Sequence, residues 1–186
     1  MNKKALVLLA DGFEDVEAIT PIDYLCRAGI EVTTASISGS LTVTSRWGKI
    51  KLIADTTLAD LGVQADNWDA VIIPGGLPGA ENLAASRETG ELLKNMAISG
   101  KFICAICASP VIVLAPLGLI SGKKYTCYPG FEEKCSLGTH FPDRVVIDGS
   151  IITSKSAGTA GEWAISIIKA LVDETESEKI AKTILI

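Results

Sequence analysis

Short runs of apolar residues are the feature of this sequence that most restricts its fold. Residues 5–10 form such a run, and residues 69–73 contain another. A strand buried on both faces carries few polar side chains, and such strands are typical of parallel sheets covered by helices. Between the runs, apolar residues recur at helical spacing, as at Val16, Ile19 and Ile22. This alternation predicts an α/β fold with a mostly parallel sheet and helices on both faces.

The same reasoning places the other elements. Further strands are predicted over residues 30–37, 125–127, 145–147 and 151–153, and a hairpin of two short extended pieces within residues 41–53. Helices are predicted from Val16 to a stop at Gly29, and over residues 80–83, 88–98, 160–172 and 176–185. Pro21 lies inside the first helix and predicts a kink there. No repeat or linker interrupts the pattern, so residues 1–186 are expected to form one domain.

The composition excludes several classes of protein. The chain has 186 residues, of which 48% are hydrophobic and 21% charged, which excludes a disordered protein. A formal net charge of −5 provides no basic surface, so neither a nucleic acid nor a membrane is an expected partner. No run reaches the roughly 18 apolar residues of a membrane span, and the first run ends too early for a signal peptide. Five cysteines are an odd number for a disulfide framework and indicate reduced thiols in the cytoplasm.

The apolar run over residues 102–106 ends at Cys107, and a helical pattern begins directly after it, with Pro110 in its first turn. Proline fits there because the first helical N–H groups have no partner within the helix. The predicted geometry is a strand, an abrupt turn and a helix, with the sulfur at the junction as in a nucleophile elbow. Free N–H groups and the helix dipole favour a thiolate at such a junction. Cys107 is therefore the candidate nucleophile, although a buried structural thiol is the ordinary alternative for a cysteine.

Two other loops follow predicted strands. Residues 11–17 follow the first strand, and Gly75 and Gly76 follow the strand at 69–73. Ligands bind beyond the carboxyl ends of the strands in such sheets, so these loops are expected to meet Cys107. The two glycines could give a tight turn or supply N–H groups for an oxyanion hole. Neither the dinucleotide fingerprint nor a phosphate-binding loop is present, so no cofactor is predicted.

Glu17 is the acidic residue expected to reach Cys107. Glu14 and Asp15 fit a solvated first helical turn, which is also the ordinary interpretation of Glu17. A thiolate and a carboxylate in contact do not both ionise cheaply, so one proton would be shared. The expectation is a protonated Glu17 that donates to the sulfur and a thiol with a low pKa.

The remaining cysteines suggest two alternatives. Cys104 and Cys107 have the spacing of a redox dithiol, but three residues along a strand separate them by roughly 10 Å, too far for a disulfide. A zinc site that combines them with Cys127 and Cys135 would need a second closely spaced pair, so no metal site is predicted. Cys26, Cys104 and Cys127 are expected to pack in the interior, and Cys135 to be exposed.

Several separated motifs occur in a fixed order: residues 5–10 with Gly12 and Glu17, residues 27–30, residues 73–76 with Gly79 and Ala80, residues 105–108 with Pro110, and Ser154 with Gly158 and Thr159. Together they resemble the ThiJ/PfpI superfamily, and within it the branch of DJ-one and YajL-like proteins. The resemblance covers essentially the whole chain.

This resemblance implies a flavodoxin-like sandwich, related to the class I glutamine amidotransferase fold, and a homodimer. It implies that Cys107 is the nucleophile, Glu17 its proton partner, and the amides of Gly75, Gly76 and Ala108 an anion cradle. The implied activity is glutathione-independent conversion of methylglyoxal or glyoxal to a hydroxyacid through a hemithioacetal on Cys107, or repair of glycated adducts. The implied alternative is a redox sensor and chaperone whose Cys107 is oxidised to a sulfinate.

Two arginines match positions of the family, and a histidine that many of its members have near the nucleophile is absent here. Arg27 and Arg46 match family positions near the dimer interface, and an ordinary surface arginine is the alternative for each. Many superfamily members place a histidine near the nucleophile, but Ala108 follows Cys107 here and Tyr128 stands at the other histidine position. His140 is the only histidine and is expected to face solvent. This argues against a cysteine peptidase or an amidotransferase.

Overall fold

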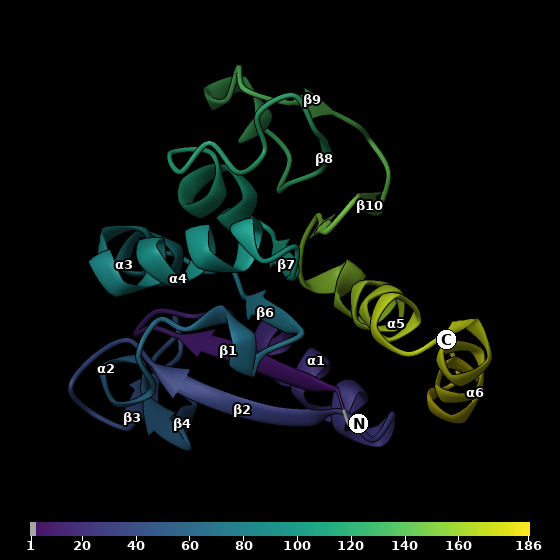
Figure 1. The fold of residues 1–186 in the computed structure, drawn as a ribbon, viewed down its shortest axis with the longest axis horizontal. Coiled ribbons are helices and arrows are strands. Elements are labelled where there is room, and N and C mark those ends of the chain that lie inside the picture. The colour runs from purple at the N-terminus through teal and green to yellow at the C-terminus, as the bar shows by residue number, and fades with distance from the viewer. Residues whose placement is uncertain (1–2) are drawn as a thin grey trace.

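A seven-stranded sheet forms the centre of the computed structural model, which describes residues 3–186 (Figure 1). In spatial order the strands are β10 (Val145–Asp148), β11 (Ile151–Ser154), β7 (Phe102–Ile106), β6 (Ala70–Ile73), β1 (Lys4–Leu9), β2 (Glu31–Ser36) and β5 (Thr56–Thr57). Neighbouring strands pair in parallel, except that β10 runs antiparallel to β11. The predicted mostly parallel sheet is therefore confirmed.

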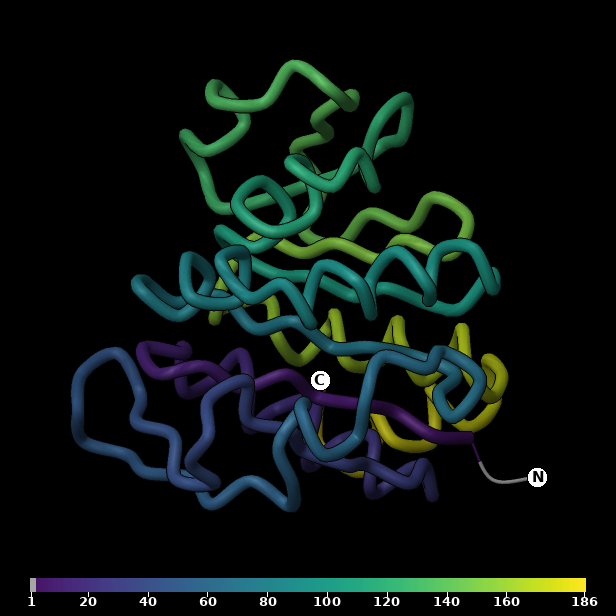
Figure 2. The backbone as a smooth tube through the Cα atoms, turned by 60° about the vertical axis from the view of Figure 1, so that its left-hand side comes forward, coloured from purple at the N-terminus to yellow at the C-terminus, as the bar shows by residue number. Residues whose placement is uncertain are grey.

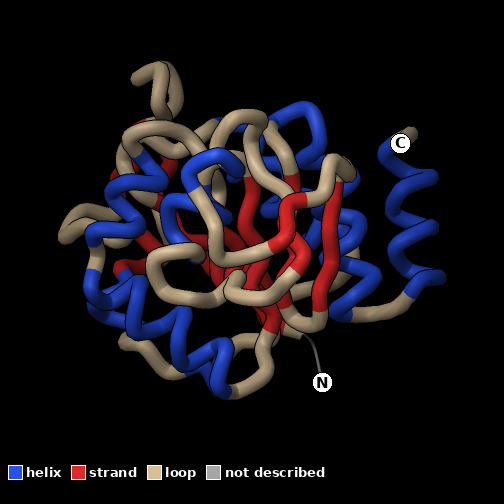
Figure 3. The backbone as a smooth tube through the Cα atoms, turned by 90° about the horizontal axis from the view of Figure 1, so that it is seen from above, coloured by secondary structure: helices blue, strands red, loops and turns tan. Residues whose placement is uncertain are grey.

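Both faces of the sheet are covered, because side chains alternate along each strand. In β1, Leu6 and Leu8 belong to one apolar core and Val7 and Leu9 to the other. The first core lies under α2 (Leu58–Leu61), α3 (Gly79–Ala85) and α4 (Arg87–Ile98), and the second under α1 (Asp15–Arg27) and α5 (Ala160–Leu171), with α6 (Glu174–Ile184) packed against α5. Figures 2 and 3 show the strands in the middle with helices around them. No helix within residues 3–186 is long and apolar enough to cross a membrane.

The first helix begins at a side-chain cap. A carboxylate oxygen of Glu14, the residue before α1, accepts a hydrogen bond from the Glu17 amide at 2.9 Å. Such a cap satisfies one of the free N–H groups of the first turn. The helix includes the buried Pro21 and continues to Arg27. Four short helical segments were not predicted: α2, η1 (Ala65–Asn67), η3 (Glu132–Lys134) and η4 (Ala157–Thr159).

Two small sheets lie outside the main one. The antiparallel pair β3 (Thr42–Thr44) and β4 (Lys51–Ile53) is the predicted hairpin. The parallel pair β8 (Lys124–Tyr125) and β9 (Thr139–His140) belongs to the segment at the top of Figure 1. The strand predicted over residues 125–127 is shorter than expected. The Thr126 amide donates to the side-chain hydroxyl of Thr153 on β11 at 2.9 Å instead of to a main-chain carbonyl.

All five cysteines are free thiols. Cys104 and Cys127 are buried, as predicted. Cys26 is exposed, which corrects the prediction that it packs in the interior. The adjacent Leu25 takes the inward position on α1, and the next residue on a helix lies about 100° around the axis. Cys135 is half-buried rather than exposed.

Candidate active site

The loops after β1, β6 and β7 meet at one edge of the sheet, as the sequence predicted. The Glu14 amide donates to the Gly75 carbonyl at 3.0 Å, and the Gly79 amide to the Gly12 carbonyl at 3.2 Å. Cys107 follows β7 directly. Main-chain hydrogen bonds thus hold the loops after β1 and β6 together, and the turn after β7 lies beside them.

Cys107 has a left-handed backbone conformation, with φ of 66°. A non-glycine residue in this region costs roughly 1 kcal/mol or more, and such residues concentrate at functional sites. Its amide donates to the Ser154 carbonyl at 3.0 Å, and its carbonyl accepts from the Tyr128 amide at 2.8 Å. The turn is therefore fixed from both sides by segments that are remote in the sequence.

The segment after Cys107 differs from the expected α-helix. It contains one π-helical turn, η2 (Pro110–Leu114), in which the Ala115 amide donates to the Pro110 carbonyl at 3.1 Å. The Ser109 hydroxyl donates to the Pro74 carbonyl at 2.6 Å and ties this turn to the end of β6. Pro110 is the first residue of η2, consistent with its predicted place in the first turn.

Glu17 reaches Cys107 although it belongs to a helix that covers the sheet. Its side chain is 1% exposed, and Oε2 accepts a hydrogen bond from the Gly75 amide at 2.9 Å. The Cys107 thiol and the Glu17 carboxylate are also hydrogen-bonded to each other. A buried acid with few partners carries a substantial desolvation penalty, so this position favours a role beyond a solvated helical turn.

Gly75 makes the contact between these two side chains possible. A Cβ atom at position 75 would lie 2.5 Å from Glu17 Oε2, 2.6 Å from Cys107 Cβ and 3.1 Å from Cys107 Sγ. Any larger residue would displace one of the two groups. The structure corrects the predicted anion cradle. The Gly75 amide donates to Glu17, whereas the amides of Gly76 and Ala108 face the sulfur.

Burial changes the proton affinity of both groups. It raises the pKa of Glu17 from 4.5 to about 7, aided by the charge of Glu14 and opposed by hydrogen bonds from Cys107 and from the amides of Gly75 and Ala157. Burial and the charge of Glu17 also raise the pKa of Cys107, against the opposing effect of the two amides that face it. The low thiol pKa predicted from the sequence is therefore not supported. Because the two groups interact strongly, they titrate as a pair, and the ionisation of each depends on the protonation of the other.

A cavity of about 170 Å³ opens above the sulfur. Its lining consists of Arg46, Gly76, Leu77, Cys107, Ala108, Tyr128 and Phe131. Arg46 and Tyr128 were both singled out in the sequence. Leu77 and Phe131 were missed, since a lone apolar residue in a loop carries no signal of its own. The cavity holds a molecule of a few heavy atoms, well below the 300–1,000 Å³ typical of drug-sized sites.

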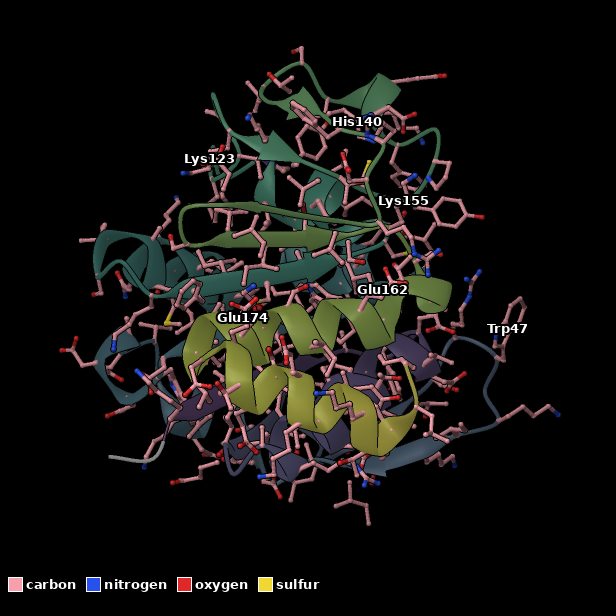
Figure 4. All side chains as sticks on the ribbon, turned by 90° about the vertical axis from the view of Figure 1, so that its right-hand side faces the viewer. Trp47, Lys123, His140, Lys155, Glu162 and Glu174 are labelled. Carbon is pink, nitrogen blue, oxygen red and sulfur yellow. The ribbon has the colours of Figure 1, made fainter. Side chains whose placement is uncertain are left out.

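The two arginines differ in position. Arg46 lines the cavity, and its guanidinium lies 4.5 Å from the centre of the Trp47 ring, a side chain that projects outward at the rim of the molecule in Figure 4. Arg27 does not reach the cavity. It is at the far end of α1, where its Nε donates to Asp23 at 2.7 Å.

His140 also differs from its prediction. It is half-buried rather than facing solvent, and its ring packs edge-on against Tyr125 with 5.8 Å between ring centres. It does not line the cavity above Cys107. One ligand atom each of His140, Cys127 and Glu132 lie within 4.8 Å of one another, so these residues could hold a metal ion.

A sequence profile of the DJ-1/PfpI family matches residues 3–170. Protein dj-1beta of Drosophila melanogaster is 40% identical to this chain over 189 residues, which cover 100% of the chain and 98% of that protein. A Caenorhabditis elegans protein named glutathione-independent glyoxalase DJR-1.2 is 37% identical, over 97% of this chain and 95% of that one. Protein DJ-1 homolog B of Arabidopsis thaliana is 39% identical over 97% of this chain, which spans only 41% of the plant protein.

Comparison with solved structures agrees with the comparison of sequences. The crystal structure of Drosophila melanogaster DJ-1beta superposes with a TM-score of 0.94 at 39% identity, covering 100% of this chain and 99% of that one. The structure titled Toxoplasma gondii DJ-1, oxidized, gives 0.93 at 36% identity over 98% of both chains. The fold and the arrangement of its loops are thus those of a flavodoxin-like α/β protein. The chain belongs to the DJ-1/PfpI family.

Proposed function

We propose that this chain converts small 2-oxoaldehydes, methylglyoxal or glyoxal, to hydroxyacids without glutathione. The observation that supports this most is that Cys107, which lines a cavity of about 170 Å³, is paired with the buried acid Glu17. A thiol, an acid whose pKa is raised to about 7 and two free amides are the groups such an isomerisation needs. A relative over nearly the full length of both chains is named a glutathione-independent glyoxalase.

The reaction begins with addition to the aldehyde carbon. Glu17 takes the thiol proton as the Cys107 sulfur forms a bond to this carbon, and the resulting oxyanion lies near the amides of Gly76 and Ala108. Glu17 then returns this proton to the oxyanion, which completes the hemithioacetal and leaves Glu17 as a carboxylate again.

The hydrogen shift follows on the same carbons. Glu17 removes the proton from the former aldehyde carbon and a proton returns to the neighbouring carbonyl carbon, which oxidises the first carbon and reduces the second. The product is a thioester of the hydroxyacid on Cys107. Water cleaves this thioester, which releases the hydroxyacid and regenerates the Cys107 thiol. In a glycated amine the former aldehyde carbon carries the amino nitrogen. The sulfur would displace this nitrogen, the amine would leave with the thiol proton taken by Glu17, and the hydrogen shift would then follow on the same carbons.

The test is a methylglyoxal assay on purified protein without glutathione. Cys107→Ser and Glu17→Gln should each abolish formation of the hydroxyacid, and Cys26→Ser, which removes an exposed thiol on α1, should leave it unchanged. Persistent turnover by Cys107→Ser would reject the proposal.

A second function, as a redox sensor, uses the same sulfur. The amides of Gly76 and Ala108 and a neutral Glu17 would stabilise a sulfinate on Cys107. A structure of a relative is titled as oxidized. Mild peroxide followed by peptide mass spectrometry should place two added oxygens on Cys107; modification mainly of Cys26 would contradict this.

We also propose a cytoplasmic homodimer. The exposed apolar side chains Val16 and Ile19 on α1, with Trp47 and Ile53 near β4, provide surface that a second copy could cover. Light scattering coupled to gel filtration should give twice the mass of 19.5 kDa. Involvement of Arg27 at this interface remains a prediction. A cysteine peptidase has less support, because the histidine such an enzyme uses as its base does not line the cavity.

A further inference from the structure

A second group of reactive side chains lies beside the cavity wall. Cys127 follows β8, Glu132 begins η3, and His140 ends β9. One ligand atom of each lies within 4.8 Å of the other two, although the residues are 5 and 8 positions apart in the sequence. Figure 4 shows His140 in the segment of β8 and β9, away from α5 and α6. None of the three belongs to the lining above Cys107.

The hydrogen bonds in this group are incomplete. His140 Nε2 is buried and has no hydrogen-bond partner among residues 3–186. Cys127 is fully buried, and its thiol lies 3.9 Å from Glu132 Oε2. That oxygen also accepts from the Gly130 amide at 2.7 Å, which fixes the carboxylate in place. A buried nitrogen without a partner costs about 1–3 kcal/mol, and a ligand bound to His140 Nε2 would remove this cost.

We propose that Cys127, Glu132 and His140 bind one Zn²⁺ ion. A thiolate, an imidazole and a carboxylate are the donors that zinc takes, whereas magnesium and calcium prefer oxygen alone. Tetrahedral zinc places its sulfur and oxygen ligands about 3.5 Å apart, given bond lengths near 2.3 and 2.0 Å. The observed 3.9 Å between Cys127 Sγ and Glu132 Oε2 is close to this distance, and the His140 nitrogen, within 4.8 Å of both atoms, would move inward as the ion binds. Zinc displaces the thiol proton, which leaves as H⁺, and water takes the fourth position.

The proposed ion would restrict the motion of residues 127–132, which form part of the wall of the Cys107 cavity. Tyr128 and Phe131 lie between Cys127 and Glu132 in the sequence, and both line that cavity. The Tyr128 amide also donates to the Cys107 carbonyl at 2.8 Å. An ion bound at both ends of residues 127–132 would fix this segment. An effect of zinc on catalysis would depend on the reactivity proposed for Cys107. The binding of zinc itself does not depend on that proposal.

The test is a titration of reduced, metal-free protein with Zn²⁺ in competition with a chromophoric chelator. One equivalent should bind, and His140→Gln and Glu132→Gln should each weaken binding at least tenfold, since even partners outside the coordination sphere change affinity 10–100-fold. Cys107→Ser and Cys26→Ser should bind zinc as the wild type does. This result would stand even if the methylglyoxal assay failed.

Cobalt provides an independent measurement of the sulfur ligand. Co²⁺ bound to the wild type should give a thiolate-to-metal charge-transfer absorption, which Cys127→Ser should remove. Circular dichroism checks that each variant is folded, and the two glutamine variants decide the question should Cys127→Ser fail to fold. The proposal is overturned if no equivalent of zinc binds, if His140→Gln and Glu132→Gln both bind like the wild type, or if Cys107→Ser abolishes binding.

Discussion

The Gly75 amide donates a hydrogen bond of 2.9 Å to the Glu17 carboxylate, so the loop after β6 holds the acid that contacts Cys107. The same glycine leaves no room for a side chain. One residue thereby sets the position of the acid and its distance from Cys107.

Gly75→Ala should destabilise the protein and disrupt the site together. The added Cβ would lie 2.5 Å from Glu17 Oε2 and 2.6 Å from Cys107 Cβ, so both must shift. Overpacking of this kind costs roughly 1–3 kcal/mol in the free energy of unfolding, which urea denaturation measures. Gly39→Ala is the control, because a Cβ there meets nothing within 4 Å. Equal stability of the two variants would show that the site adapts to the extra atom.

Activity should rise with pH through the ionisation of Glu17. Glu17 must be a carboxylate to take the thiol proton, and burial and Glu14 raise its pKa to about 7. The acidic limb of kcat/KM for methylglyoxal should therefore have its midpoint near 7. Glu14→Gln removes one contribution to this pKa and should move the midpoint to lower pH. A midpoint that stays fixed in Glu14→Gln would contradict this assignment.

Stability should depend on pH through the same group. The pKa of Glu17 rises from 4.5 to about 7 on folding, so the contribution of its bound proton is complete below pH 4.5 and is lost as the pH rises through 7. Glu17→Gln has no such proton. Relative to this variant, the wild type should lose up to about 3 kcal/mol in free energy of unfolding between pH 4 and pH 8. Urea denaturation of both proteins at each pH measures the difference, and a constant difference would mean that folding leaves the pKa of Glu17 unchanged.

Arg46→Met should raise KM more than it lowers kcat. The guanidinium lines the cavity and can donate to an oxygen of the substrate or product. Loss of one charged hydrogen bond corresponds to roughly tenfold or more in KM. Arg27→Met is the matched control, since this arginine pairs with Asp23 away from the cavity. Equal effects in the two variants would remove Arg46 from the binding site.

The sequence predicted the sheet because strands buried on both faces lack polar residues, and β1, β6 and β7 all have this property. The meeting of Glu17 with Cys107 also followed, because parallel strands end at the same edge. The pKa of the Cys107 thiol could not be predicted from the sequence. Its position before a helical turn favours a thiolate, whereas burial and the charge of Glu17 oppose it. That balance depends on atomic contacts that no residue pattern records.

The candidate metal site could not be predicted from the sequence either. It consists of Cys127, Glu132 and His140. Their spacings match no known ligand motif, and the loops that join them have no periodicity from which a turn could be read. His140 was expected to face solvent because its neighbours in the sequence are polar. Its packing against Tyr125 is a tertiary contact and overrides that local composition.

The left-handed backbone at Cys107 means that stability alone would select glycine at this position, because glycine adopts φ near 66° without steric cost. A lineage that no longer needed the sulfur would be expected to drift toward the relaxed residue. Conservation of cysteine at this position among relatives would therefore indicate selection on chemistry rather than on stability.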